Sequence, residues 1–184
     1  MRWRGLFDDL EAQFEAAQAA ELAGEVAERT RRETALLRLV DRLRAAEGAP
    51  VVVSLPAAAG VLRGRVLDAG SDWLLVEESG GREVLVRLAA VLGVTGVGPR
   101  AAAPDDGPVA KRLDLRWALR GLARSRAGVA VGLVDGTLVT GTLDRVGADH
   151  LDLAEHGLGE ARRAGAVRQV RLVPLAAVAF VRSG

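Results

Sequence analysis

The 184-residue sequence lacks cysteine, tyrosine, asparagine and isoleucine, and it holds a single lysine beside 24 arginines. Without cysteine the sequence provides no disulfide, no thiolate nucleophile and no cysteine-ligated zinc or iron–sulfur site. Aromatic residues make up only 3%, which leaves few side chains on which unpaired bases stack. The excess of Arg, Ala and Val without Asn or Ile is typical of a GC-rich bacterial coding sequence.

A dominant charge is also missing, because 25 basic residues face 24 acidic ones and the formal net charge is +1. Such a chain has no overall field that attracts nucleic acid or a membrane surface. No apolar run approaches the roughly 20 residues of a membrane helix, and the basic start is followed by acids rather than by the apolar core of a signal peptide. We therefore expect a cytoplasmic protein without membrane contacts. With 49% hydrophobic and 27% charged residues, it has the composition of a globular chain.

An internal repeat organises the sequence. The segment from 51 to 91 aligns with the segment from 129 to 178, and both copies end on the same four residues, Leu-Ala-Ala-Val. The residues that coincide in register are Gly64 and Gly141, Gly70 and Gly147, and Asp72 and Asp149. This agreement predicts two copies of one structural unit.

Each copy has the pattern of short β-strands. Apolar residues recur at every second position at Val51, Val53 and Leu55, and again further along the copy. Asp135-Gly136 between two such runs indicates a tight hairpin, because glycine tolerates the positive φ of that turn. Gly64 and Gly141 fall where a strand must bend sharply, as in small closed barrels. We predict an α+β, mostly β fold with two tandem five-stranded barrels.

Apolar residues at helical spacing precede each copy. They are Leu36, Leu37, Val40 and Leu43 before the first copy, and Leu115, Leu119 and Leu122 before the second. The N-terminal segment carries a further apolar stripe and predicts an amphipathic arm. The expected domains are this arm (1–29), a helix with the first barrel (30–98), a linker (99–108) and a helix with the second barrel (109–184).

The end of the arm allows two interpretations. Thr30-Arg31-Arg32-Glu33 matches a capping box, which starts a new helix. The pairs Glu25–Arg29 and Glu28–Arg32 have the i,i+4 spacing that supports one unbroken helix. We favour a continuous or slightly broken arm.

The strand motifs resemble those of the Sm-like family of small barrels, which share features with SH3-like barrels. The segment Leu133-Val134-Asp135-Gly136-Thr137-Leu138-Val139-Thr140-Gly141-Thr142-Leu143-Asp144 is similar to the first Sm motif, and the likeness covers about residues 30–98 and 109–182. The resemblance implies ring assembly by pairing of strand edges and RNA binding on the ring face. The asparagine that holds uracil in that family, and the basic pair of its second motif, have no match here.

Catalytic chemistry has little support in the sequence. No Gly-x-Ser-x-Gly elbow surrounds a serine, and Gly93-x-x-Gly96-x-Gly98 lacks the Lys-Ser/Thr of a phosphate loop. His150 and Asp152 share a strand face, but two residues are too few ligands to close a metal site. We expect no enzyme activity, catalytic residue, metal, cofactor or small-molecule substrate.

Basic residues concentrate between the copies, where residues 99–128 carry seven basic and three acidic side chains, a local charge of +4. We call Arg112, Arg116, Arg120 and Arg124, which recur at i+4, the Arg stripe; Arg162 and Arg163 are the further candidate contacts. The stripe can bind phosphates, or it is the solvated face of a helix. We favour the solvated face.

Apolar residues at outward positions indicate an interface. Alternation places Trp73 and Leu75 outward where the second copy has His150 and Asp152, so this pair needs cover from the arm, the other barrel or another subunit. The candidate interface is Phe7, Leu10, Phe14, Trp73 and Leu75. We predict an assembly or protein-interaction module that associates with itself or a protein partner, and the alternative is a regulator that binds RNA or DNA through the Arg stripe.

Overall fold

The computed structural model of the chain describes residues 3–56, 60–104, 107, 112–157 and 167–183, and the side chains of residues 3–10 and 12 are outside that description. It divides into two compact units, Met1–Arg38 and Leu39–Gly184. We call the second one the sheet unit and describe the two units separately.

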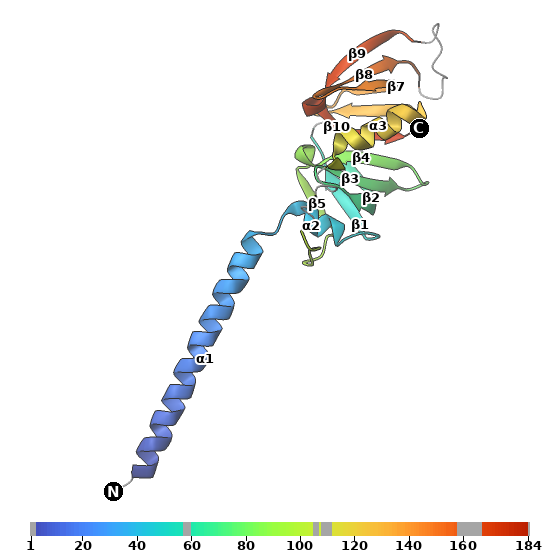
Figure 1. Cartoon of the computed structure of the whole chain (residues 1–184). Helices are drawn as coiled ribbons and strands as arrows, with labels where there is room; N and C mark the ends of the chain where they lie inside the picture. Colours follow the sequence, from blue (N-terminus) through green and yellow to red (C-terminus); the bar gives the residue numbers. More distant parts are fainter. Residues whose placement is uncertain (1–2, 57–59, 105–106, 108–111, 158–166, 184) are drawn as a thin grey trace. The chain divides into compact units, whose positions relative to one another are not determined.

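The first unit is a single helix, α1 (Trp3–Ala35), shown in Figure 1. The helix runs without a break through the capping-box residues, and the Thr30 hydroxyl donates to the Val26 carbonyl inside the helix at 2.8 Å. Exposed ion pairs join Arg29 to Glu33 at 3.0 Å and Arg32 to Glu28 at 3.1 Å. The continuous interpretation of the arm is therefore the one that the structure adopts. Among the described residues, no helix is both long enough and apolar enough to span a membrane.

The prediction of a helix directly before the first copy, from Leu36 to Leu43, is wrong in its extent. α1 ends at Ala35, and only a short helix, α2 (Leu39–Arg44), precedes the strands. The amides of Leu36 and Leu37 bond carbonyls three residues back, a tightened last turn that is common where helices end. Leu36 and Leu37 are exposed, whereas Val40 and Leu43 are buried in the sheet unit.

Ten strands form one antiparallel sheet in the sheet unit, in the order β5-β1-β2-β3-β4-β10-β6-β7-β8-β9 (Figure 1). The first repeat contributes β1 (Pro50–Ser54), β2 (Val61–Ala69), β3 (Trp73–Glu78), β4 (Glu83–Arg87) and β5 (Gly93–Thr95), with the 3₁₀ turn η2 (Leu88–Ala90) before β5. The second contributes β6 (Gly128–Leu133), β7 (Leu138–Val146), β8 (His150–Glu155), β9 (Gln169–Pro174) and β10 (Val178–Ser183), with η4 (Leu175–Ala177) before β10. The fold is thus mostly β, with helices added.

The two repeats share their strand register. Gly64 lies opposite Val51 and Glu78 in the first repeat, and Gly141 lies opposite Val129 and Glu155 in the second. In both repeats the register shifts at the same place on the second strand, between Val66 and Asp68 and between Leu143 and Arg145. The repeat seen in the sequence is therefore also a repeat of strand pairing.

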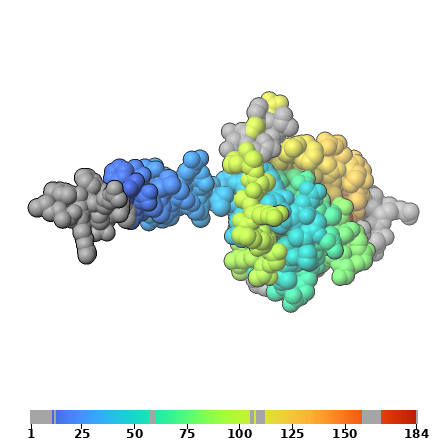
Figure 2. Space-filling view, turned by 90° about the horizontal axis from the view of Figure 1, so that it is seen from below, coloured from blue at the N-terminus to red at the C-terminus, as the bar shows by residue number. Residues whose placement is uncertain are grey.

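The described strands form one open sheet, and their pairing does not show the two separate closed barrels of the expected fold. In each repeat the first strand pairs with the last, β1 with β5 and β6 with β10. β4 then pairs with β10 of the other repeat instead of closing its own, with Leu85 opposite Val181. The described sheet is open, and β5 and β9 are its edges. Figure 2 shows the first repeat, coloured from cyan to green, as one continuous surface.

Two apolar cores lie along this sheet, and the repeats exchange side chains between them. The first core includes Val53, Val66 and Leu74, and it also takes Phe180 from β10. The second core includes Leu119 and Leu151, and it takes Trp73 and Leu85 from the first repeat. Each repeat therefore completes the core of the other, so we expect the two to unfold together.

The helix α3 (Leu115–Ser125) covers the second core and confirms the helix expected there. The Asp114 carboxylate caps it by accepting from the Trp117 amide at 2.9 Å. Leu115 and Leu119 are buried, and the helix ends at Arg126 in the left-handed conformation, with φ of 52°. The amphipathic pattern thus places one face on the core and leaves the arginines on the other.

Candidate functional site

The candidate site is the junction where β4 of the first repeat pairs with β10 of the second. Trp73 is at its centre and is only 6% exposed. The indole donates from Nε1 to the Leu113 carbonyl at 2.9 Å, and its ring lies so close to Gly70 that a Cβ there would collide with it. Leu75 is half-buried against the second core. The second repeat of the same chain therefore covers this apolar pair.

The start of α3 is held by the first repeat. The Asp72 carboxylate accepts from the Leu115 amide at 2.7 Å, and a negative charge at a helix N-terminus is favourable. The Asp72 carbonyl accepts from the Leu88 amide at 2.9 Å, as the carbonyl of its counterpart Asp149 accepts from the Leu175 amide at 2.7 Å. The backbone contact belongs to both repeats, whereas the contact with α3 belongs to the junction alone.

Two arginines complete the junction with long-range polar contacts. The Arg87 guanidinium donates to the carbonyls of Val178 and Ala176, each at 2.6 Å. Arg182 of β10 pairs with Glu78 of β3 at 2.9 Å. Sequence reasoning missed these contacts, because they join residues about ninety or more positions apart. The sequence nevertheless held a signal of the contact, because the two copies differ at this position: Arg87 in the first aligns with Pro174 in the second.

The second repeat has polar residues where the junction has apolar ones. The His150 ring lies against Gly147, as Trp73 lies against Gly70. Its Nδ1 bonds the Asp149 carboxylate at 2.8 Å and its Nε2 lies 3.8 Å from Asp152. The hydrogen bond from His150 holds the pKa of Asp149 below its ordinary value. In the described part of the chain, no three His, Asp or Glu side chains come together as a metal-binding group.

The junction strands β4 and β10 have counterparts in the other repeat, and these counterparts are the two edge strands of the described sheet. Each edge strand pairs with a strand on one side of the described sheet. β9 is the counterpart of β4, and its Leu172 side chain is 66% exposed, with Val170 exposed beside it. β5 is the counterpart of β10. Next to it lies a cavity of about 150 Å³ lined by Leu39, Arg42, Val91, Leu92, Gly93, Val94 and Val97. Within the described part of the chain, each edge therefore offers unpaired backbone groups next to apolar surface.

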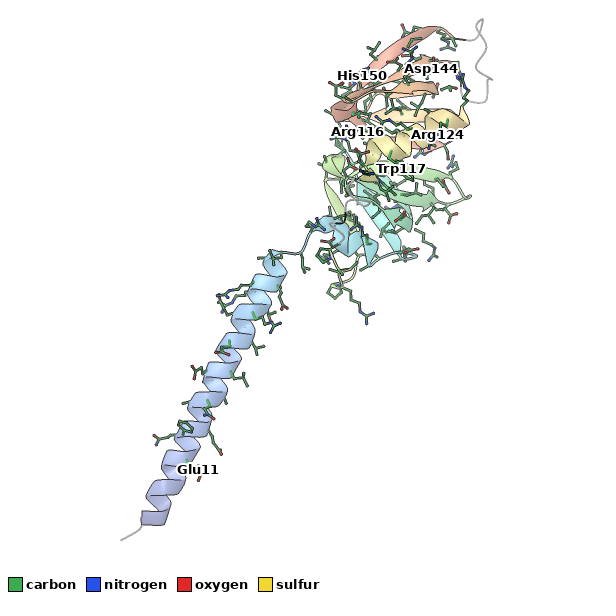
Figure 3. All side chains as sticks on the ribbon, in the orientation of Figure 1. Glu11, Arg116, Trp117, Arg124, Asp144 and His150 are labelled. Carbon is green, nitrogen blue, oxygen red and sulfur yellow. The ribbon has the colours of Figure 1, made fainter. Side chains whose placement is uncertain are left out.

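The Arg stripe is only partly helical. Arg116, Arg120 and Arg124 are exposed on α3, with Arg116 and Arg124 near opposite ends of the helix in Figure 3. Arg116 donates to the Asp114 carboxylate at 2.7 Å, and this contact neutralises part of the positive charge of the guanidinium. Arg112 is exposed but precedes the helix. Arg162 and Arg163 lie outside the described residues.

The apolar residues of the arm are placed in part. Phe14 on α1 is exposed in its unit, and so are Leu22 and Val26 further along the helix. The side chains of Phe7 and Leu10 lie outside the described residues. Phe14 thus keeps apolar surface that its own unit does not bury.

Glu155 gives the second repeat a pH-dependent contact. Its carboxylate accepts from Arg171 and from the Gln169 amide of β9, the latter at 3.0 Å. These bonds, the one from Arg171 foremost, hold the pKa of Glu155 below its ordinary value. A pKa lowered by folding stabilises the protein fully above the ordinary value, about 4.3 for glutamate, and this stabilisation is lost as pH falls through the folded-state pKa.

We therefore expect Glu155→Gln to reduce the free energy of unfolding at neutral pH, and the deficit relative to the wild type to shrink below about pH 4.3. Urea titrations followed by circular dichroism at several pH values measure this. The exposed Glu47→Gln serves as the control for losing a carboxylate outside this contact. A Glu155→Gln deficit that is constant down to about pH 3 would contradict the assignment.

No protein-family model matches the chain, and no curated protein matches its sequence.

Proposed function

We propose that this chain is a non-enzymatic assembly module of two tandem Sm-like barrels, which binds further copies of itself through the edges of its sheet. The observation that carries the proposal is the junction: β4 pairs with β10, while the counterparts of these two strands, β9 and β5, end the sheet. One chain therefore offers both halves of a contact that it already makes internally.

The repeat supplies the register of the proposed contact. Across the junction Val86, Leu85 and Val84 lie opposite Phe180, Val181 and Arg182. The shared ending of the two copies matches each of these residues with one 87 positions away. If two chains pair in the register of the junction, Leu172 of one chain lies opposite Val94 of the next. Leu172 then lies near the cavity beside β5, and its exposed surface is buried.

The contact between chains is expected to be weaker than the junction. Pro174 replaces Arg87, so the two guanidinium–carbonyl bonds have no counterpart, and Thr95 replaces Arg182. Glu155, which matches Glu78, is engaged by Arg171 in its own repeat. Hydrogen bonds to charged groups contribute about 1.5–3 kcal/mol each. Association is therefore reversible, and a head-to-tail contact of this kind gives closed rings or open filaments.

The test is the molar mass of the full chain in solution, measured by light scattering after size exclusion over a range of concentrations. The wild type should exceed the monomer mass, and Leu172→Arg should return it to the monomer because it places a charge in the contact. The control is Leu138→Arg, at a similarly exposed position (56% against 66%) on the interior strand β7. A wild type that is monomeric throughout, or a Leu172→Arg variant that still assembles, would overturn the proposal.

A further inference from the structure

A cavity of about 340 Å³ opens beside the junction, between the sheet and α3. It is lined by Asp68, Trp73, Leu75, Glu83, Leu85, Trp117, Ala118, Gly121, Leu122, Val181 and Ser183. This junction cavity has the size of a small ligand site. It lies within the sheet unit, and neither edge strand lines it.

The floor of the cavity is one row of apolar residues across three strands. Leu75 lies opposite Leu85, and Leu85 lies opposite Val181, so the row crosses β3, β4 and β10. Trp73 continues the floor along β3 on the same face, two residues from Leu75. Because β4 and β10 belong to different repeats, the floor exists only where the repeats are joined.

The wall is formed by α3. Trp117 is 48% exposed and projects from the side of α3 that faces the first repeat (Figure 3). Gly121 lies one turn further on, and a Cβ built there meets no atom within 4 Å. The cavity is therefore open beside Gly121. Two indoles, one buried and one half-exposed, line the same space.

The rim carries negative charge that the described residues do not neutralise. Asp68 and Glu83 are exposed, and neither carboxylate is ion-paired with a described Lys or Arg. Asp68 accepts the amide of its neighbour Ala69 at 2.7 Å. The Ser183 hydroxyl donates to the backbone carbonyl of Glu83, not to its carboxylate, at 3.3 Å. An apolar, aromatic cavity thus has two carboxylates among the residues that line it.

We propose that the junction cavity binds a small organic cation, namely an ammonium or guanidinium group carried on an apolar body. The apolar body is taken from water by the floor, the cation is attracted to the indole faces, and the carboxylates favour its charge. The same carboxylates disfavour anions. This ligand class is independent of the edge contact, because residues other than those of β5 and β9 form the cavity.

Three probes of similar size separate charge from apolar contact: 3-phenylpropylamine as the cation, 3-phenylpropanol as the neutral control and 3-phenylpropionate as the anion. The chain has three tryptophans, so Trp3→Phe leaves Trp73 and Trp117 as the only indoles. Titration followed by their fluorescence should show saturable binding of the amine, about tenfold weaker binding of the alcohol and none of the acid.

Two variants locate the site. Gly121→Leu fills the cavity and replaces a helix-interior glycine with a better helix former, so it should keep the fold and abolish amine binding. Asp68→Asn combined with Glu83→Gln should lower the amine affinity to that of the alcohol and leave the alcohol unchanged. Circular dichroism and thermal unfolding confirm that each variant is folded.

Three outcomes overturn the proposal. One is equal binding of all three probes, or of none at millimolar concentration. Another is unchanged amine binding by folded Gly121→Leu. The third is an amine affinity that Asp68→Asn combined with Glu83→Gln leaves unchanged, because the carboxylates then do not attract the cation. Failure of the edge contact leaves all three readouts intact, so the two proposals fail separately.

Discussion

Trp73→Ala is expected to destabilise the sheet unit by about 3–5 kcal/mol, whereas His150→Ala at the matching position of the second repeat costs less than about 1 kcal/mol. Trp73 is 6% exposed and lies in the core of the other repeat. Removing the indole leaves a cavity, and the Leu113 carbonyl loses the hydrogen bond that it accepts from Nε1. Gly70 also loses the ring that packs against it. The His150 side chain is partly exposed, and its ring bonds the carboxylate of its neighbour Asp149.

Equilibrium unfolding in urea, followed by circular dichroism, measures both variants on the same scale. The wild type should unfold in one transition, since each repeat contributes to the core of the other. Trp73→Ala should lower the midpoint strongly, and it can be compared directly with His150→Ala because the two positions share their place in the repeat. Similar losses for the two variants would show that the junction does not carry the stability that its burial implies.

The repeat explains how much of the fold the sequence predicts. Alternating apolar residues and the glycines at 64 and 141 predict the strands, and the helical spacing of Leu115, Leu119 and Leu122 predicts α3. The same kind of spacing gave a wrong extent for the helix at 36–43, because Leu36 and Leu37 are apolar but find no core. Local pattern shows that a residue is apolar, and only tertiary structure shows whether a surface exists to bury it.

The junction is the part that local pattern does not reach. A strand at the end of its own repeat's run of pairs, such as β4, has the same alternation whether it pairs within its repeat, with the other repeat or with another chain. The pairing of Leu85 with Val181 and of Glu78 with Arg182 therefore has no local signal. Trp73 was recognisable as a residue that needs cover, since its counterpart is His150, but its partner was not. Asymmetry between the two copies is thus the best sequence guide to the contacts that join them.

Gly141→Val is expected to destabilise the sheet unit by about 3 kcal/mol, at the upper end of the cost of overpacking. Gly141 lies on the interior strand β7, opposite Val129 on one side and Glu155 on the other. A Cβ at this position collides with the Ala154 carbonyl and lies 3.1 Å from the Glu155 Cα. Both obstacles are backbone, so the strands themselves must separate to admit a side chain.

The matched control is Gly128→Val on the neighbouring strand β6, because a Cβ at Gly128 meets no atom within 4 Å. It should change the free energy of unfolding by less than about 1 kcal/mol, since valine is also favoured in strands. Urea unfolding of both variants decides the matter. Equal stability of Gly141→Val and the wild type would mean that β7 and β8 separate without cost, and the close approach of these strands at Gly141 would then not be required by the fold.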